Sequence, residues 1–289
     1  RLPRAIRDVY KRQIENRLMQ YLLSVENISR VHNSRTNQQN EYYTSEMLDE
    51  IFSEIWQSLN KKNKSLFPIE SIIKDSAIFK ASPFHKLTQE QINAKEEILT
   101  KIKESILLNE DGQLIIVEGE AGSGKTVLMS TLLYELGKYN LDLDENLDIH
   151  LLVNHNEHVS IYSQIASKLG IANKKNKIVQ KPTSFINNNS SDEKVDVVIV
   201  DEAHLLLTQG KQSYQGKNHL DDLLARAKVV VIVFDIKQVL TTEQIWEVDK
   251  LNEYFDKAKS NSNHVTLRNQ MRINSDISTV NWIRNLDDY

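Results

Sequence analysis

Residues 119–126 constrain the fold of this chain more than any other part of the sequence. They read Gly-Glu-Ala-Gly-Ser-Gly-Lys-Thr, follow the apolar run 114–117 and lead into the helical pattern of residues 127–136. In a strand, glycine-rich turn and helix of this spacing, backbone N–H groups and the helix N-terminus face phosphate oxygens. The sequence therefore predicts an α/β fold with a phosphate-binding loop at the end of a strand. A plain glycine-rich turn is the alternative.

The last two residues of this loop carry the expected chemistry. We expect the Lys125 ammonium to reach the β- and γ-phosphates of a nucleotide and the Thr126 hydroxyl to bind Mg²⁺. The nucleotide-binding residues expected from the motif are Gly119, Glu120, Ala121, Gly122, Ser123, Gly124, Lys125 and Thr126. ATP and Mg²⁺ are therefore the expected cofactors.

From residue 87 onward, apolar strands and amphipathic helices alternate. We expect strands at residues 114–118, 149–154, 195–201, 229–235 and 264–267, and helices at 90–108, 126–138, 159–169, 220–227 and 243–255. Apolar strands that are separated by helices indicate a parallel sheet covered on both faces. The predicted fold class is α/β: a RecA-like P-loop NTPase with a parallel sheet flanked by helices, preceded by a small helical region.

The residues before this alternation form a separate region. Residues 14–28 and 47–59 carry apolar side chains at helical spacing and are joined by the polar segment 31–41, so we expect a helical N-terminal region over residues 14–84. Residues 1–13 resemble translated sequencing-adapter sequence, and we leave them out of the fold reasoning as a non-native segment. A basic N-terminal helix is the alternative, and its packing decides between the two.

The composition excludes several classes of protein. The chain has 289 residues, no cysteine and a formal net charge of −4, which excludes disulfides, thiolate metal sites and a uniformly basic surface. No apolar run is long enough to cross a membrane, and we expect a soluble, cytoplasmic protein. Residues 158–191 contain no acidic residue and carry lysines at positions 168, 174, 175, 177 and 181. This stretch either binds the phosphates of a nucleic acid or is a solvated loop.

An acidic pair follows the apolar strand 195–200, in the order Asp201-Glu202-Ala203-His204. Because the carboxyl ends of parallel strands meet at one edge of a sheet, we expect these acids beside the phosphate-binding loop. We assign Asp201 to the Mg²⁺ shell, and Glu202 to orienting and deprotonating the attacking water. An acidic pair placed there by chance is the alternative. His204 either relays between the nucleotide and a nucleic-acid surface or caps the following loop.

Three further side chains are candidates for contact with the nucleotide. Gln238 follows the strand 229–235 and is expected to hydrogen-bond the γ-phosphate and report its loss; a surface glutamine is the alternative. Gln91 offers a donor and an acceptor to the adenine edge, although Thr88 and Gln91 also have the spacing of a helix capping box. Arg272 is expected to stabilise charge on the γ-phosphoryl group, with an ordinary surface arginine as the alternative.

Two pairs of residues are not assigned to the site. His155 and His158 lie close in the sequence, but no third ligand at a recognised spacing accompanies them, so we do not expect a metal site there. Tyr214 and Trp246 are isolated aromatic residues, which usually pack in the core rather than stack on bases.

The order of these motifs resembles that of the superfamily 1 helicases. Residues 87–91, the phosphate-binding loop, residues 201–204, Asp235-x-x-Gln238 and Gln270-x-Arg272 follow one another in that order. The amino-acid sequence between these motifs, from about Leu87 to the end, resembles the Schlafen group 3-type DNA/RNA helicase domain. The resemblance implies an ATPase that converts ATP and water to ADP and phosphate and acts as a motor on single-stranded DNA or RNA. An ATP-gated switch or assembly protein that unwinds nothing is the alternative.

The resemblance also implies where the nucleic acid and a second domain lie. Residues 154–157 and 182–185 are expected to touch the strand, with Phe185 stacked on a base; core packing of Phe185 is the alternative. Superfamily 1 helicases hold ATP between two RecA-like domains. We therefore expect residues 85–263 to form the first such domain and residues 264–289 to begin a second one, as in a fragment of a longer motor.

Overall fold

A six-stranded sheet forms the centre of the molecule. The structure, a computed structural model, describes residues 4–32, 46–143, 147–172, 177–208, 214, 216–235, 238 and 248–268. The described strands are β1 (Gln113–Gly119), β2 (Ile149–Leu152), β3 (Val179–Gln180), β4 (Val195–Val200), β5 (Ala227–Phe234) and β6 (His264–Leu267). They lie in the order β3-β2-β4-β5-β1-β6, and every neighbouring pair is parallel. The predicted α/β class with a parallel sheet is confirmed.

The strands are buried on both faces, as their apolar sequences predict. Successive side chains of a strand point to opposite faces. In β1, Ile115 and Val117 join one hydrophobic core, whereas Leu114 and Ile116 join the other. A sheet of this kind is stable only between two layers of helices.

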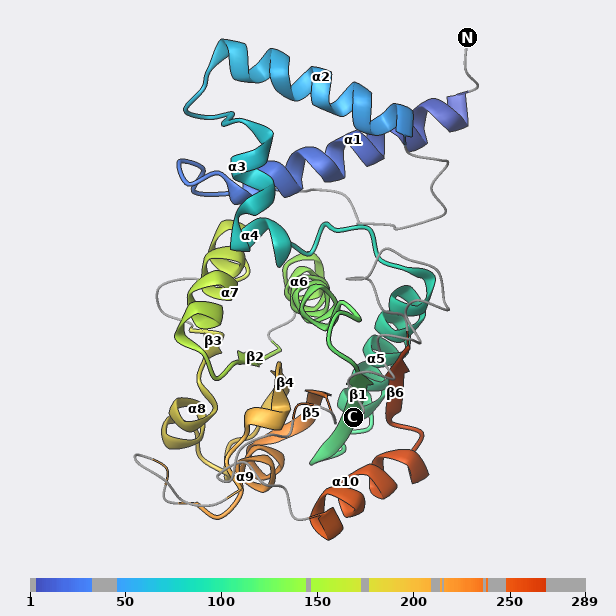
Figure 1. Ribbon diagram of the computed structural model, residues 1–289. Helices are drawn as coiled ribbons and strands as arrows, with labels where there is room; N and C mark the ends of the chain where they lie inside the picture. The colour runs from blue at the N-terminus through green and yellow to red at the C-terminus, as the bar shows by residue number, and fades with distance from the viewer. Residues whose placement is uncertain are drawn as a thin grey trace, which may run out of the picture.

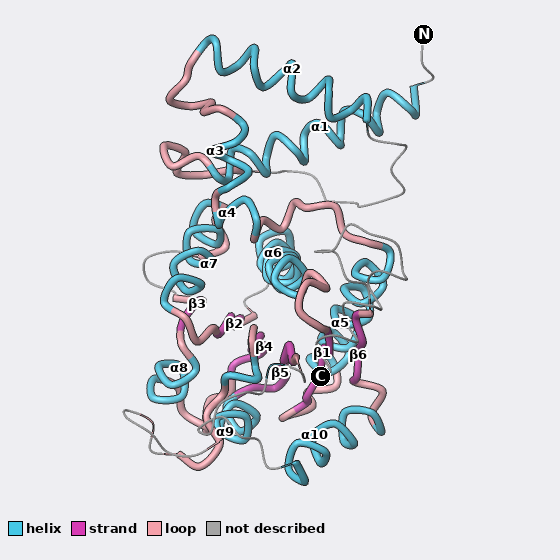
Figure 2. Tube along the Cα trace, viewed as in Figure 1, coloured by secondary structure: helices cyan, strands magenta, loops and turns pink. Residues whose placement is uncertain are grey.

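Two groups of helices supply these layers, and the strands lie between them (Figure 2). The first core contains residues of α5 (Gln89–Leu107), α6 (Lys125–Leu143) and α7 (Asn156–Lys168), and the second contains residues of α8 (Pro182–Asn188), α9 (His219–Arg226) and α10 (Val248–Ser260). The short elements β3 and α8 were not predicted from the sequence, because two and seven residues are too few to show a periodic pattern.

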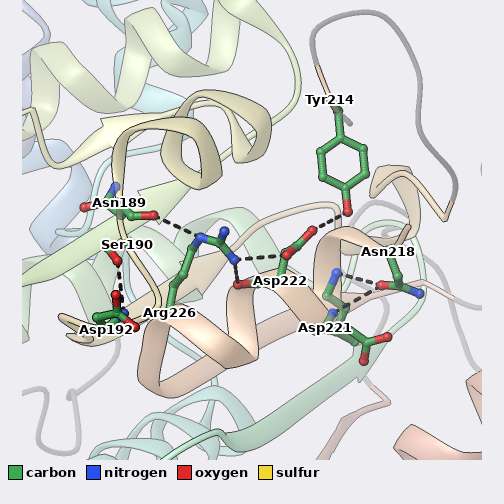
Figure 3. A network of polar contacts seen from close by, with 9 residues as sticks. Asn189, Ser190, Asp192, Tyr214, Asn218, Asp221, Asp222 and Arg226 are labelled. Atoms are coloured by element: carbon green, nitrogen blue, oxygen red, sulfur yellow. Dashed lines mark hydrogen bonds and ion pairs between the residues drawn. The ribbon is translucent and has the colours of Figure 1, made fainter. Parts of the chain in front are cut away.

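A polar network ties α9 to its surroundings (Figure 3). The Tyr214 hydroxyl donates to Asp222 Oδ2 at 2.6 Å, and Arg226 Nη1 donates to Asp222 Oδ1 at 3.0 Å. Arg226 Nε also donates to the backbone carbonyl of Asn189, just after α8, at 3.0 Å. Tyr214 is buried, so the expectation that it packs is confirmed; Trp246 lies outside the described residues.

The N-terminal helical region consists of α1 (Arg4–Ser24), α2 (Glu46–Lys62), α3 (Glu70–Asp75) and α4 (Ala77–Lys80). Its own core contains Tyr21, Phe52 and Trp56, with the Tyr21 ring centroid 4.7 Å and 4.8 Å from the other two. The helix expected from residue 14 begins at Arg4, inside residues 1–13, the segment predicted to be non-native. In Figure 1 this region lies over α6 and α7.

Lys168 of α7 anchors this region to the sheet domain. Its ammonium donates to the backbone carbonyls of Leu23 at 2.9 Å and Val25 at 2.8 Å, and its side chain is buried. Burial lowers the pKa of Lys168. Lys168 therefore fits neither alternative for residues 158–191, a phosphate-binding surface or a solvated loop, because the side chain points inward to another part of the chain.

The end of the sheet domain also needs correction. β6 pairs in parallel with β1, so that His264 lies opposite Ile116 and Leu267 opposite Gly119. Residues 264–267 therefore belong to the same sheet as the phosphate-binding loop, and the domain boundary that we placed before residue 264 moves beyond Leu267. A four-residue strand carries no sequence pattern that tells which sheet it joins.

Candidate nucleotide site

The carboxyl ends of three neighbouring strands form the candidate site. β5 lies between β4 and β1, so the residues after these strands meet at one edge of the sheet. A cavity of about 510 Å³ opens there, and its lining includes Gly124, Lys125, Thr126, Asp201, Glu202 and Gln238. This volume lies within the usual range for sites that hold a small molecule. The structure thus brings together most of the site residues that the sequence predicts.

The loop after β1 has two glycines in the left-handed backbone conformation. Gly122 and Gly124 have φ values of +86° and +78°, in the region that glycine adopts without steric cost. Ser123 between them is 4% exposed, and its Oγ has no hydrogen-bond partner among the described residues. A buried hydroxyl without a partner is costly, and a phosphate oxygen is a suitable acceptor for it. The loop therefore fits an anionic ligand.

Lys125 already binds oxygen atoms in this structure. Its ammonium donates to the backbone carbonyls of Gly119 and Glu120, and to Asp235 Oδ2 at 2.9 Å. Sequence reasoning missed Asp235 as a member of the site. Its position directly after β5 was the available indication, since Asp201 stands in the same place after β4.

Asp201 is held by two neutral donors. Its Oδ2 accepts a hydrogen bond from the Tyr162 hydroxyl at 2.8 Å, and its Oδ1 accepts one from the backbone N–H of Glu202 at 3.0 Å. Burial raises the pKa of Asp201, with a smaller contribution from the Glu202 carboxylate. A buried carboxylate whose donors are uncharged fits a bound cation, which would supply the missing positive charge.

Tyr162 connects Asp201 to the phosphate-binding loop. Its hydroxyl lies 2.8 Å from Asp201 Oδ2 and 3.3 Å from the backbone carbonyl oxygen of Thr126. Burial raises the pKa of Tyr162, and the Asp201 carboxylate raises it further, so the hydroxyl stays protonated and can donate. The two residues expected to hold Mg²⁺, Thr126 and Asp201, therefore contact one buried hydroxyl. From the sequence, Tyr162 was predicted only as a residue of the helix 159–169.

Glu202 lies beside α7. Its backbone adopts the left-handed conformation with φ of +55°, which is uncommon for a residue with a β-carbon. Its Oε2 lies 3.4 Å from Nδ1 of His158, one helical turn before Tyr162 on α7. Both acids of the pair are thus contacted from the same helix.

His204 lines the same cavity. It is buried, and its ring packs edge-on against Phe234 with a centroid separation of 6.4 Å. Its Nδ1 has no hydrogen-bond partner in the described part of the chain, and burial lowers its pKa. His204 is therefore a neutral side chain at this cavity at neutral pH. A relay role stays a prediction.

The two glutamines occupy different positions. Gln238 is exposed at the edge of the cavity, and its backbone N–H donates to the carbonyl of Asp235 at 3.1 Å. Gln91 is buried: its Oε1 accepts from the backbone N–H of Thr88 at 2.9 Å, and its Nε2 donates to the carbonyl of Ser123 at 3.1 Å. The capping box is confirmed. Both ends of the amide are used within the protein, so Gln91 holds the phosphate-binding loop, and contact with adenine stays a prediction.

Comparison with known proteins supplies the family. Residues 112–289 match the family described as Schlafen group 3, DNA/RNA helicase domain. The chain belongs to this helicase-domain family. It is also 31% identical over 216 residues to the uncharacterized protein YPL245W of Saccharomyces cerevisiae, a match that covers 68% of this chain and 47% of the yeast protein. The chain thus spans about half the length of this relative.

Phe185 does not lie on the surface of the helicase domain. It is 0% exposed and packs edge-on against His150, with ring centroids 5.0 Å apart. Pro182 is also buried, at the start of α8. Of the two alternatives for Phe185, core packing is confirmed and stacking on a base is not, because the aromatic ring fills the core between α8 and the sheet.

Arg272, the arginine expected to contact the γ-phosphoryl group, lies outside the described residues of the helicase domain.

His155 and His158 have ring centroids 5.8 Å apart, and the described residues contain no group of three or more metal-ligating side chains. No helix among the described residues has the length and apolar character needed to cross a bilayer.

Proposed function

We propose that this helicase domain binds ATP with Mg²⁺ at the cavity beside β1, hydrolyses ATP to ADP and phosphate, and uses the reaction to move along single-stranded DNA or RNA. One observation carries the proposal: Lys125, the acidic pair and Gln238, which are far apart in the sequence, line a single cavity. Membership of a DNA/RNA helicase-domain family supports the same activity.

In the proposed reaction, binding begins with an exchange at Lys125. Phosphate oxygens replace Asp235 as a partner of the ammonium, while backbone N–H groups of the loop and the first turn of α6 contact the other oxygens. Thr126 and Asp201 would hold Mg²⁺, which supplies positive charge against the phosphates. Tyr162 keeps the Asp201 carboxylate in one orientation through the hydrogen bond described above.

Hydrolysis then requires an oriented water molecule. In the proposed step, the water oxygen attacks the γ-phosphorus, the bond between this phosphorus and the bridging oxygen breaks, and ADP leaves with that oxygen. The proton of the water passes to the Glu202 carboxylate, which lines the cavity. Gln238, exposed at the cavity edge, would hydrogen-bond the γ-phosphate. Arg272 would add a positive charge there.

Binding and hydrolysis can be tested separately in the purified chain. Binding of a fluorescent ATP analogue and release of phosphate would be measured with and without single-stranded DNA and RNA oligonucleotides. We expect K125A to abolish nucleotide binding, and E202Q to bind ATP but not turn it over. Lys61, an exposed lysine at the end of α2, offers a matched control in K61A, which should behave as the unmodified protein.

The outcomes separate the two candidate functions. Phosphate release that rises with single-stranded nucleic acid supports the motor. Turnover that no nucleic acid stimulates refutes the motor and favours an ATP-gated switch, for which a cavity wall shared with the N-terminal helical region is a suitable basis. No binding of any nucleotide by the unmodified protein refutes both.

A further inference from the structure

Part of the wall of the nucleotide cavity comes from the N-terminal helical region. Ala77 and Lys80 of α4, together with Ala81 directly after it, line the same cavity as Lys125 and Asp201. The proposed reaction assigns nothing to these residues. They lie more than 40 positions before Lys125 in the sequence, so only the fold brings them there.

Packing fixes α4 at this place. Ala81 and Phe84 belong to a hydrophobic cluster with Tyr134 of α6 and Ile165 of α7, and the Phe84 and Tyr134 rings lie 5.2 Å apart. α6 begins at Lys125 itself, and α7 carries Tyr162. Figure 1 shows α4 beside these two helices. The segment that carries Lys80 is thus packed on the helices that form the site.

Pairing distinguishes Lys80 from Lys125 of the cavity and from Lys74 of the neighbouring helix α3. Lys125 is neutralised by Asp235 at 2.9 Å, and Lys74 of α3 pairs with Glu70 at 3.0 Å. The Lys80 ammonium has no ion pair or hydrogen bond among the residues that the structure describes, and its side chain is exposed. An unpaired ammonium pays no cost for giving up a protein partner when it binds an anion.

The charge of the cavity leaves a place for such a cation. Its described lining carries Lys80 and Lys125 as cations and Asp201 and Glu202 as anions, while Asp235 offsets Lys125. ATP with one Mg²⁺ brings a further net negative charge, so binding is favoured by positive charge beyond that of Lys125.

We propose that Lys80 is a second phosphate-binding cation of the nucleotide site, so that the N-terminal helical region completes the site for a nucleoside triphosphate. The inference rests on the proposed function, because it takes the cavity to be the nucleotide site. It gives the N-terminal helical region a direct role in nucleotide binding.

The test compares nucleotide affinity in matched lysine variants. Dissociation constants of fluorescent ATP and ADP analogues would be measured for the unmodified chain, K80A, K80R and the control K61A, with Mg²⁺ and with a chelator. We expect K80A to weaken ATP binding roughly three- to tenfold, as for a partly exposed charge-assisted contact, K80R to restore most of it, and K61A to have no effect. Thermal unfolding of K80A should match that of the unmodified chain, since Lys80 is exposed and unpaired.

The results distinguish this inference from the proposed function. Equal affinities of K80A and K61A for ATP, in a chain that does bind ATP, would overturn the role of Lys80 and leave the nucleotide site standing. An equal loss in K80A and K80R would also overturn it, because it would show that charge is not the cause. If the unmodified chain binds no nucleotide, the proposed function fails, and the inference fails with it.

Discussion

Replacing Asp235 by Asn tests how Lys125 is held. The ammonium lies 2.9 Å from Asp235 Oδ2, and the two side chains are 12% and 2% exposed, so the pair is largely buried. Removal of one partner of a buried pair costs about 3–5 kcal/mol. Lys125 keeps two backbone carbonyl acceptors, and the Asn side chain still offers an amide oxygen. We therefore expect D235N to lower the free energy of unfolding by about 2 kcal/mol, less than the full range.

The same substitution should tighten nucleotide binding. In the unmodified protein, phosphate must displace a carboxylate from the Lys125 ammonium. In D235N it displaces only a neutral amide. The difference between a charged and a neutral acceptor is about 1 kcal/mol, so we expect a roughly fivefold lower dissociation constant for ATP. Fluorescence titration with an ATP analogue measures the affinity, and urea unfolding measures the stability.

A second ion pair of the sheet provides the control. Lys228 Nζ lies 2.9 Å from Asp196 Oδ1, and neither residue lines the cavity. D196N should lower stability but leave nucleotide affinity unchanged. If D235N binds ATP no more tightly than the unmodified chain, or if D196N tightens binding as much, then Asp235 does not compete with phosphate for Lys125 and the reasoning is refuted.

Three further substitutions test other contacts. Y162F removes the hydroxyl that orients Asp201, so it should lower the free energy of unfolding by about 1–2 kcal/mol. It should also raise the Mg²⁺ concentration needed for nucleotide binding; an unchanged Mg²⁺ titration would show that Tyr162 only packs. Q91A should weaken ATP and GTP binding alike, because it loosens the loop, whereas a loss confined to ATP would show that Gln91 contacts adenine. Burial lowers the pKa of His219 from its ordinary 6.5 to about 4, so its contribution to stability is complete above pH 6.5 and is lost, by about 3 kcal/mol, as the pH falls from 6.5 to about 4. H219Q should remove most of this pH dependence of the free energy of unfolding, measured by urea unfolding at a series of pH values. An unchanged pH dependence would contradict the assignment of this loss of stability to His219.

The sheet and the principal site residues could be predicted because their sequence patterns are local. β5 is an uninterrupted run of apolar residues after its first two positions, which indicates a strand buried on both faces. The loop 119–126 carries its function in adjacent residues, and the position of Asp201 follows from the rule that strand ends share one edge. These inferences need no knowledge of the strand order.

The partners of the site residues could not be predicted in the same way. Asp235 reaches Lys125 only because β5 is inserted between β4 and β1, an order that the spacing of residues along the chain does not show. Tyr162 has the helical spacing of a core residue, and only the packing of α7 on the sheet shows that its hydroxyl meets Asp201. The two alternatives for Phe185 could not be separated from the sequence, because an aromatic side chain suits both a base and a core; its burial shows that it packs in the core.

Lys125 and Asp201, two of the predicted site residues, already have partners inside the protein. Lys125 is paired with Asp235, and Asp201 accepts a hydrogen bond from Tyr162, so each of these two groups has an internal partner. Under the proposed function, nucleotide binding is therefore an exchange of partners, and its free energy is a difference between protein contacts and ligand contacts. Asp235 directly follows β5 and Tyr162 lies on α7, and α7 is joined through Lys168 to the N-terminal helical region. A ligand that displaces or reorients them acts on separate elements of the fold at once. Occupancy of such a site can be coupled to the rest of the protein only if the contacts with the ligand differ in free energy from the protein contacts that they replace. Coupling should therefore be measured at the two partner residues, Asp235 and Tyr162.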